Sequence, residues 1–541
     1  MYIISNNNYT SRPIMLVRFF CPGIRSRKKG PRKQKDSAST QTLTPAQILT
    51  SLVSVSVGVE QDRNESGQNE DWSRTVAGVD GCIYGIPYYA RRVVKFNPVD
   101  KSIHHIGPDL GGGAKFSVGV LDDKGCIYCL PGTNSFRQIL KIDTNPASST
   151  CTDTGTNTDD AGTDTTGTDN VDTEGVTLLE HVLPERGLWM SGALAMDGKI
   201  YCMPYTARRI LKIDPYNDTA ETILVGDDLG NELYLYLGTI AGSNGEEVYG
   251  IPQFANCFIK YNIQTGNTSV VGTKTPYRGG FAFCSGNGVL GRDNNIYIAC
   301  DKGQVMKIDT STSTRRNANN GAHSIVGNTV LEKAMAGSIG SRRIAGSTRR
   351  WCDGVLGVDG CIYWPPRDAK QTLKYDPVSN ISSLVGLEFG NIRGKWNNGV
   401  HVHDHDRDHD HAHASDGIIY CLPSNAKYVL RIDAYGYYVS SLRRDMERYP
   451  EKLGLIFESK HDNRTNSEEM GTLYENAMIK FGEKRGFQTV VDCLPPSDKF
   501  LGTSAGACRG FYPYALAASL PNSSVSIIYH LLRQDPSLLH V

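Results

Sequence analysis

The stretch of the sequence most suggestive of chemistry alternates histidine with aspartate between residues 401 and 413. Imidazole and carboxylate groups are ligands that suit Zn²⁺, Ni²⁺ or Cu²⁺, and a flexible tract can wrap such an ion loosely. Alternation alone fixes neither a coordination geometry nor supporting hydrogen bonds. The tract therefore also fits a low-complexity loop, or one that binds a divalent metal adventitiously, and we expect no dedicated cofactor. The candidate ligands are His401, His403, His405, His409, His411 and His413.

A second motif, Gly502-Thr-Ser504-Ala-Gly506, matches the pattern G-x-S-x-G and looks like the nucleophile motif of patatin-type lipases. Such an elbow needs a strand before it and a helix after it, inside an α/β sheet. Only 35 residues follow Gly506, too few for the rest of that fold. We interpret the motif as a flexible loop and predict no catalytic residues.

The composition narrows the classes of protein further. The chain has 541 residues, 39% of them apolar, and a formal net charge of zero, which argues against specific nucleic-acid binding. Its 14 cysteines are too few for a disulfide scaffold, and no apolar run is long enough to span a membrane. We expect an intracellular protein, cytoplasmic or nuclear. The basic residues before Asp36 leave organelle targeting open.

An internal repeat in the sequence indicates the strands on which any functional site would be placed. The phrase Asp-Gly-x-Ile-Tyr-x-x-Pro, followed by a run such as Leu-Lys-Ile-Asp, occurs in seven more or less complete copies. Where no insertion intervenes, the copies lie 44 or 48 residues apart, and they contain only strand-like runs. That period is typical of four-stranded propeller blades. The central tyrosines are Tyr84, Tyr128, Tyr201, Tyr249, Tyr297, Tyr363 and Tyr420.

Two more strands per copy complete each blade. One is an apolar run ending in glycine, as at Val225-Gly226, and the other has an aromatic residue three positions before a glycine, as at Trp396 and Gly399. The sequence thus predicts an all-β, seven-bladed β-propeller of four-stranded antiparallel blades. We expect the strand from Trp72 to Val76 to complete the last blade or, failing that, the run from Tyr437 to Leu442.

The repeated phrase, with its later Val-Gly and Lys-Trp-x-x-Gly-Val-Leu parts, resembles a group of repeat β-propeller proteins of unicellular algae. The resemblance covers roughly residues 72–440. It implies the fold and brings no catalytic residues with it.

The repeat also sets the expected domains. Residues 1–70 are predicted to be a disordered basic segment, and residues 71–440 the propeller, with disordered insertions at about 145–182, 310–349 and 401–414. Residues 441–541 are predicted to form a small α-helical tail. Its last part, 511–541, looks like an ankyrin-type helix pair.

The turn after each Ile-Pro joins the same two strands in every blade, so all these turns must open on one face of the ring. Aromatic and arginine side chains are typical anchors of binding surfaces, and loops on a rigid scaffold often carry function. The sequence therefore predicts a mildly basic, aromatic rim, although ordinary solvated hairpins would show the same repetition. The candidate binding residues are Tyr88, Tyr89, Arg91, Tyr205, Arg208, Phe254, Arg367, Lys370 and Lys427.

Two functions follow from these features. The first is a non-enzymatic scaffold that binds a protein or peptide on one face, and it needs no membrane, nucleic acid or cofactor. The alternative is a propeller lyase or hydrolase acting on a small or sugar-like substrate in the central channel. The alternative requires acidic residues, histidine or tyrosine to converge in the channel. Because the repeated residues are glycine, isoleucine, tyrosine, proline and lysine, we favour the scaffold.

Overall fold

The structure is a computed structural model. It describes residues 50–56, 72–134, 136–145, 175–183, 187–215, 221–229, 235–271, 286–300, 303–310, 323–327, 350–351, 353–402 and 417–437. By contact the chain divides into residues 1–42 and residues 43–541, and every described residue belongs to the second unit.

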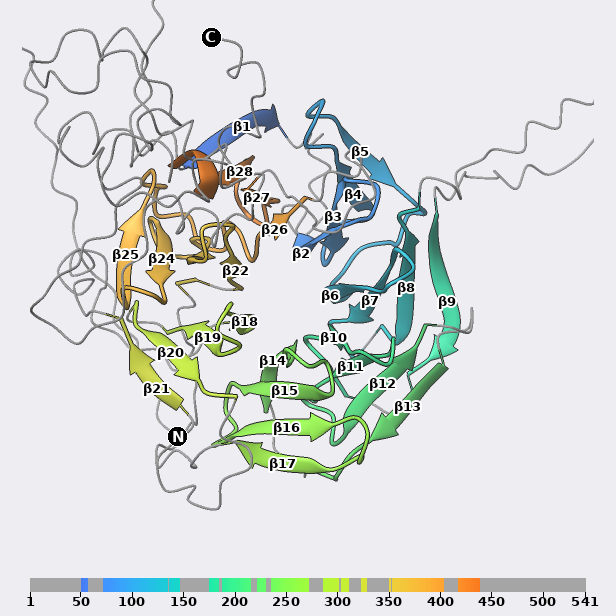
Figure 1. Ribbon diagram of the computed structural model, residues 1–541. Coiled ribbons are helices and arrows are strands. Elements are labelled where there is room, and N and C mark those ends of the chain that lie inside the picture. Colours follow the sequence, from blue (N-terminus) through green and yellow to red (C-terminus); the bar gives the residue numbers. More distant parts are fainter. Residues whose placement is uncertain are drawn as a thin grey trace, which may run out of the picture. The chain divides into compact units, whose positions relative to one another are not determined.

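The described strands form seven four-stranded antiparallel sheets arranged as the blades of a propeller (Figure 1). Blades 1 to 7 follow one another around the ring in chain order, with the first strand of each of blades 1 to 6 innermost (Figure 1). The predicted fold class is confirmed.

The first three blades are as follows. Blade 1 consists of β2 (Trp72–Ala77), β3 (Ile83–Pro87), β4 (Val93–Phe96) and β5 (Ile103–Ile106). Blade 2 consists of β6 (Phe116–Leu121), β7 (Cys126–Pro131), β8 (Gln138–Asp143) and β9 (Val176–Val182). Blade 3 consists of β10 (Ala193–Leu194), β11 (Ile200–Cys202), β12 (Ile210–Asp214) and β13 (Glu221–Val225).

The other four blades repeat this pattern. Blade 4 consists of β14 (Tyr236–Ala241), β15 (Glu247–Pro252), β16 (Phe258–Asn262) and β17 (Thr268–Val271). Blade 5 consists of β18 (Val289–Leu290), β19 (Ile296–Ala299), β20 (Val305–Ile308) and β21 (His323–Val326). Blade 6 consists of β22 (Val355–Leu356), β23 (Ile362–Trp364), β24 (Thr372–Asp376) and β25 (Ile381–Val385). Blade 7 consists of β26 (Val400–His401), β27 (Ile418–Cys421), β28 (Tyr428–Asp433) and β1 (Thr50–Ser56).

Ring closure differs from both predictions. The outer strand of blade 7 is β1, which pairs antiparallel with β28 from Thr50 opposite Ile432 to Ser56 opposite Tyr428. The strand that begins at Trp72 is the inner strand of blade 1. An N-terminal strand does complete the last blade, but it lies upstream of the predicted one, inside the segment expected to be disordered. It had no repeat phrase to mark it.

Two predicted insertions also contain blade strands. The range 145–182 includes β9, and the range 310–349 includes β21, each the outer strand of its blade. The described part of the C-terminal region adds one short helix at residues 434–437. The predicted ankyrin-like helix pair at 511–541 and the motif at Gly502–Gly506 lie outside the described residues.

Among the described residues, seven apolar clusters form the core of the ring, one at each interface between neighbouring blades. At the interface between blades 7 and 1, for example, Trp72 and Phe96 pack with Tyr420 and Val429. Each sheet thus buries its apolar faces against its two neighbours, and the first and last blades complete the circle.

In blades 1, 5 and 6 the repeated Asp, Tyr and Lys bond to one another near the turn between the first and second strands. In blade 1, Asp80 accepts hydrogen bonds from the Cys82 amide at 3.0 Å and the Tyr84 hydroxyl at 2.7 Å, and Lys95 Nζ lies 2.9 Å from the same carboxylate. Burial acts to raise the pKa of Asp80, but the bonds from Lys95, Tyr84 and Cys82 outweigh it and lower the pKa. The repeat is therefore explained by the needs of each blade.

An aromatic residue at the start of an inner strand, or a few residues before it, bonds to the neighbouring hairpin in several blades. The indole Nε1 atoms of Trp189, Trp351 and Trp396 donate to the carbonyl oxygens of Arg209, Gln371 and Tyr428 at 2.9 to 3.0 Å. The glycine three residues later is required by close approach. A Cβ atom at Gly399, for instance, would lie 2.6 Å from Ile419.

Deleting residues 1–57 should open the ring, because β28 would lose its outer partner and expose an unpaired edge. We expect the midpoint of thermal unfolding to fall by about 5 °C or more, with a tendency to aggregate. Deleting residues 1–42, which retains β1, is the matched control and should change the midpoint little. Equal midpoints for the two deletions would mean that β1 does not close the ring.

Equivalent aspartates in blades 5 and 6 allow a paired test of burial. Asp359 and Asp293 bind tyrosine and lysine alike, but their side chains are 1% and 39% exposed. Asp359→Ala should cost about 3 kcal/mol, since it leaves the Lys374 ammonium buried without its anion. Asp293→Ala should cost less than about 1 kcal/mol. Denaturant unfolding of both variants measures the difference, and similar losses would refute the role given to burial.

Candidate functional site

The turns between the second and third strands of all blades open on one face of the ring, as antiparallel connectivity requires. We call it the hairpin face. The connections from one blade to the next lie on the same face and hydrogen-bond to these turns. In blade 1, the Lys115 amide donates to Tyr88 O at 2.8 Å, and the Leu110 amide donates to Arg91 O at 2.8 Å. Blades 3 and 6 repeat both contacts, so the face has a regular, well-braced backbone.

Buried lysines hold two of these connections. Lys115 Nζ donates to the carbonyl oxygens of Gly111 and Gly113 at 2.9 Å each, and Lys395 Nζ donates to Ile392 O at 2.8 Å. Burial lowers the pKa of Lys395 to about 8, an effect that Asp368 partly opposes.

All nine predicted rim residues lie on hairpins of the hairpin face, but in blades 1, 3, 4, 6 and 7, so they surround the ring and do not form one cluster. Tyr88 and Tyr89 stack edge to face with ring centroids 4.8 Å apart. Phe254 is 44% exposed. Tyr205 and Arg367 are half-buried, and the remaining four, Arg91, Arg208, Lys370 and Lys427, are exposed.

The rim is less basic than the sequence suggested. Arg91 Nε donates to Asp109 at 2.9 Å, and Arg208 Nε donates to Asp228 at 3.0 Å, each forming an ion pair within its own blade and connection. The hydrogen bonds from Arg91 lower the pKa of Asp109. The two arginines are therefore matched by acids and do not present net positive charge.

Sequence reasoning missed a polar network at the mouth of the central channel. The position just before the inner-strand glycine is occupied by different residue types around the ring, while the neighbouring positions repeat. In blade 1, Thr75 replaces the glycine. The equivalent residues are Arg74, Val118, Ser191, Leu237, Asn287, Asp353 and Asn398. A position-by-position comparison of the inner strands would have shown this variation in the sequence and so pointed to the network.

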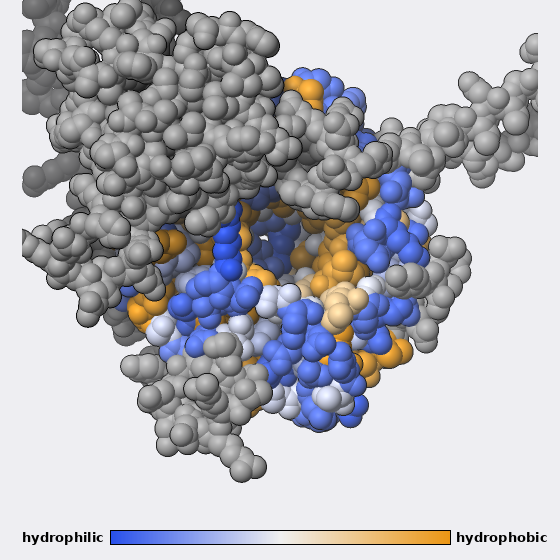
Figure 2. All heavy atoms as spheres, in the orientation of Figure 1, coloured by the Kyte–Doolittle hydropathy of each residue, from blue (hydrophilic) through white to orange (hydrophobic). Residues whose placement is uncertain are grey.

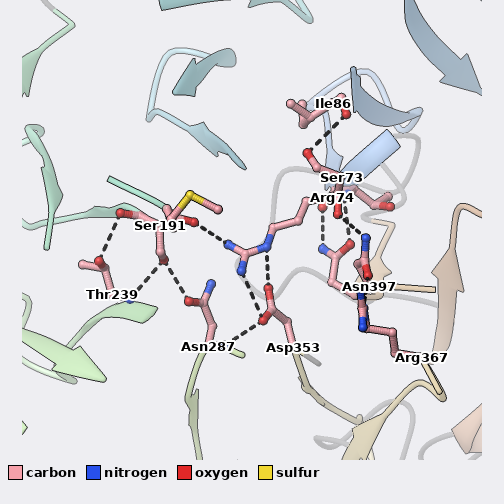
Figure 3. Close-up of polar contacts among 12 residues, drawn as sticks. Ser73, Arg74, Ile86, Ser191, Thr239, Asn287, Asp353, Arg367 and Asn397 are labelled. Atoms are coloured by element: carbon pink, nitrogen blue, oxygen red, sulfur yellow. Dashed lines mark hydrogen bonds and ion pairs between the residues drawn. The ribbon is translucent and has the colours of Figure 1, made fainter. Parts of the chain in front are cut away.

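Arg74 reaches across the ring from blade 1 to blades 3 and 6, neither of which adjoins blade 1 (Figure 3). Its Nε lies 2.9 Å from Asp353 Oδ2, and its Nη1 donates to Met190 O at 3.1 Å. The side chains of Arg74 and Asp353 are 12% and 9% exposed. An ion pair shielded to this degree interacts more strongly than one on the surface.

Blades 3, 4 and 5 extend the network. The Asn287 amide nitrogen of the main chain donates to Asp353 Oδ1 at 2.6 Å, and Ser191 Oγ donates to Asn287 Oδ1 at 2.8 Å. Thr239 is tied to Ser191 twice, through its main-chain nitrogen at 3.0 Å and its hydroxyl at 3.1 Å (Figure 3). The network thus joins five blades of the ring.

Blade 7 closes the network onto blade 1 and connects it to the rim. Asn397 Nδ2 donates to Ser73 O at 2.8 Å, and Asn398 exchanges hydrogen bonds of 2.7 and 2.8 Å with the main chain of Thr75. Arg367 Nε, from the predicted rim, donates to Asn397 Oδ1 at 3.1 Å (Figure 3). The rim and the channel mouth are therefore parts of one hydrogen-bonded surface.

Only His401 of the histidine tract lies among the described residues. His401 lies in β26, with Nε2 2.8 Å from Leu356 O and Nδ1 3.2 Å from Ile418 O, so both ring nitrogens already face protein acceptors. The other five histidines lie outside the described residues. Within the described ranges, no group of three or more His, Cys, Asp or Glu is arranged to hold a metal ion, and no helix is long and apolar enough to cross a membrane.

The chemistry available at the channel mouth is recognition by hydrogen bonds. The Asp353 carboxylate accepts from Arg74 and from the Asn287 main chain, so it is poorly placed to act as a general base. Ser191 donates to an asparagine oxygen and has no histidine beside it in the described network.

The chain has a distant likeness to several solved structures. A catalytically inactive virginiamycin B lyase from Staphylococcus aureus, solved with quinupristin, is 13% identical, with a TM-score of 0.46 over 68% of this chain and 97% of the lyase. The β-propeller domain of Cps50 (Swd1) from Myceliophteria thermophila is 5% identical, with a TM-score of 0.43 over 71% of this chain and 100% of that domain. No protein-family profile and no curated protein matches the chain. Likeness at this level carries no argument about function.

The cross-channel pair can be tested by a double-mutant cycle. Arg74→Met should destabilise the protein by about 3 kcal/mol, because it leaves Asp353 shielded from water without its cation. Adding Asp353→Leu should restore much of that loss, so the double variant should be clearly more stable than the sum of the single changes predicts. Unfolding in denaturant provides all four stabilities. Additive losses would contradict the pairing.

Proposed function

We propose that this propeller is a non-enzymatic scaffold that binds a protein or peptide on its hairpin face. The main support for the proposal is a difference between two kinds of position in the blades, those whose residue type repeats from blade to blade and those whose residue type varies. The repeated residues serve the structure of each blade, whereas the varied residues gather at the channel mouth, on the side that the rim surrounds. The blades do not need different residue types at these positions in order to fold.

The state of the rim supports binding. Its hairpins are braced by indole, main-chain and ion-pair contacts, so little order would have to be imposed when a partner binds. Phe254 and, on the connection between blades 6 and 7, Ile392 expose apolar surface at 44% and 51%. Exposed apolar residues beside charged lysines suit a peptide-like partner.

Binding fits the channel mouth better than catalysis does. Arg74, Asp353, Ser191 and Thr239 satisfy one another, and the network lacks a nucleophile beside a base among the residues that the structure describes. The partner is expected to be neither a membrane nor a specific nucleic acid, and the proposed location is the cytoplasm or nucleus, with organelle targeting left open.

The proposal predicts that altering exposed rim residues removes a partner. The combined change Lys370→Glu, Lys427→Glu and Phe254→Ser alters charge and apolar contact together, and should reduce capture of a specific protein from the source cells at least tenfold. Quantitative mass spectrometry of the captured material measures the change.

Lys124→Glu is the matched control, because this exposed lysine lies on a turn between first and second strands and so on the opposite face. It should retain the partner within about twofold, and thermal unfolding should show that all variants fold. A partner retained by the triple variant, or lost equally with Lys124→Glu, would contradict binding by the hairpin face.

A further inference from the structure

At the channel mouth, two side chains carry hydrogen-bond donors that no other described residue accepts. Asn287 Nδ2 makes no hydrogen bond to any other described residue, and it lies on the side of the amide that faces the Arg74 guanidinium (Figure 3). Arg74 uses three of its five N–H groups, on Asp353 and Met190. Both donors belong to the inner part of the ring, whose centre is hollowed and bordered by hydrophilic and hydrophobic residues (Figure 2).

The Asn287 side chain is held in one orientation. Ser191 Oγ accepts from the Thr239 amide, so its own proton is directed to Asn287 Oδ1, which leaves Nδ2 pointing away. Close approach is possible because position 238 is glycine. A Cβ atom there would lie 2.8 Å from Asn287 Oδ1. The donor is thus built into the inner strands of blades 3, 4 and 5.

The charge at the mouth selects the kind of group that can enter. The Arg74 and Asp353 charges offset each other at 2.9 Å. An entering carboxylate would have to compete with Asp353 for one guanidinium, and an entering cation would meet Arg74, each at a desolvation cost. An uncharged group that accepts from Asn287 and donates to Asp353 would fit without either conflict.

Resting on the proposed function, we propose that the channel mouth is a subsite for the uncharged amide of an asparagine or glutamine side chain, presented by a peptide bound on the hairpin face. The amide oxygen would accept from Asn287 Nδ2 and Arg74, and the amide NH₂ would donate to the Asp353 carboxylate. An amide meets both requirements with one planar group, and its neighbours along the peptide would contact the rim.

Selection from a random dodecapeptide library on the intact protein tests the subsite. The enriched peptides should share an asparagine or glutamine. Asn287→Leu, similar in volume but without hydrogen bonds, should weaken their binding about tenfold, as expected for loss of one hydrogen bond to a buried donor. Asn267→Leu is the matched control, because Asn267 is exposed on the turn between the third and fourth strands of blade 4, on the opposite face. It should change the dissociation constant less than twofold.

The outcomes separate the subsite from the scaffold. Peptides that lose affinity with the triple rim variant but not with Asn287→Leu would overturn the subsite and leave the scaffold standing. Enrichment of acidic or basic residues in place of amides would also overturn it. If no peptide is enriched while a neutral glycan on an array binds in an Asn287-dependent manner, the mouth recognises a sugar, and both proposals fail. Failure of both peptides and glycans to bind would count against both as well.

Discussion

Every blade of this protein depends on being covered by the next one. A four-stranded sheet with apolar residues on both faces is not stable alone, and the seven apolar clusters lie between blades, not within them. Closure therefore determines the stability of the whole ring. It is achieved twice, by β1 pairing with β28 at the outer edge and by Asn397 and Asn398 bonding to blade 1 at the channel.

The same constraint separates structural residues from candidate functional ones. The Asp-Gly turn, the buried tyrosine and the paired lysine recur because each blade must end its hairpin and bury its second strand in the same way. The channel is the place where the blades need not be alike, since the inner strands face one another across open space. Arg74 and Asp353 use that freedom to join blades that do not touch through their sheets.

The repeat made the blades, their number and the hairpin face predictable, because a period with strand-like runs has few structural solutions. Closure was harder. The sequence places Trp72 in a strand without a preceding blade. Its place just before the first repeat phrase is that of an inner-strand aromatic residue, but Thr75 replaces the glycine that marks the other inner strands. The strand β1 has no motif, and its place follows from the unfilled edge of β28.

The channel-mouth network could not be read from local sequence, because Arg74 and Asp353 are 279 residues apart and meet only in a closed ring. The acids that pair with the rim arginines could be predicted from the sequence. Asp109 and Asp228 each lie two residues after the glycine that follows an outer strand, and their arginine partners each follow the repeat phrase. Two arginines of the expected basic rim, Arg91 and Arg208, are thus balanced by acids, around a mouth whose Arg74 and Asp353 charges also balance. A surface that has neutralised its strongest charges discriminates by hydrogen-bond geometry and apolar contact, and such a surface selects the shape of a partner more than its charge.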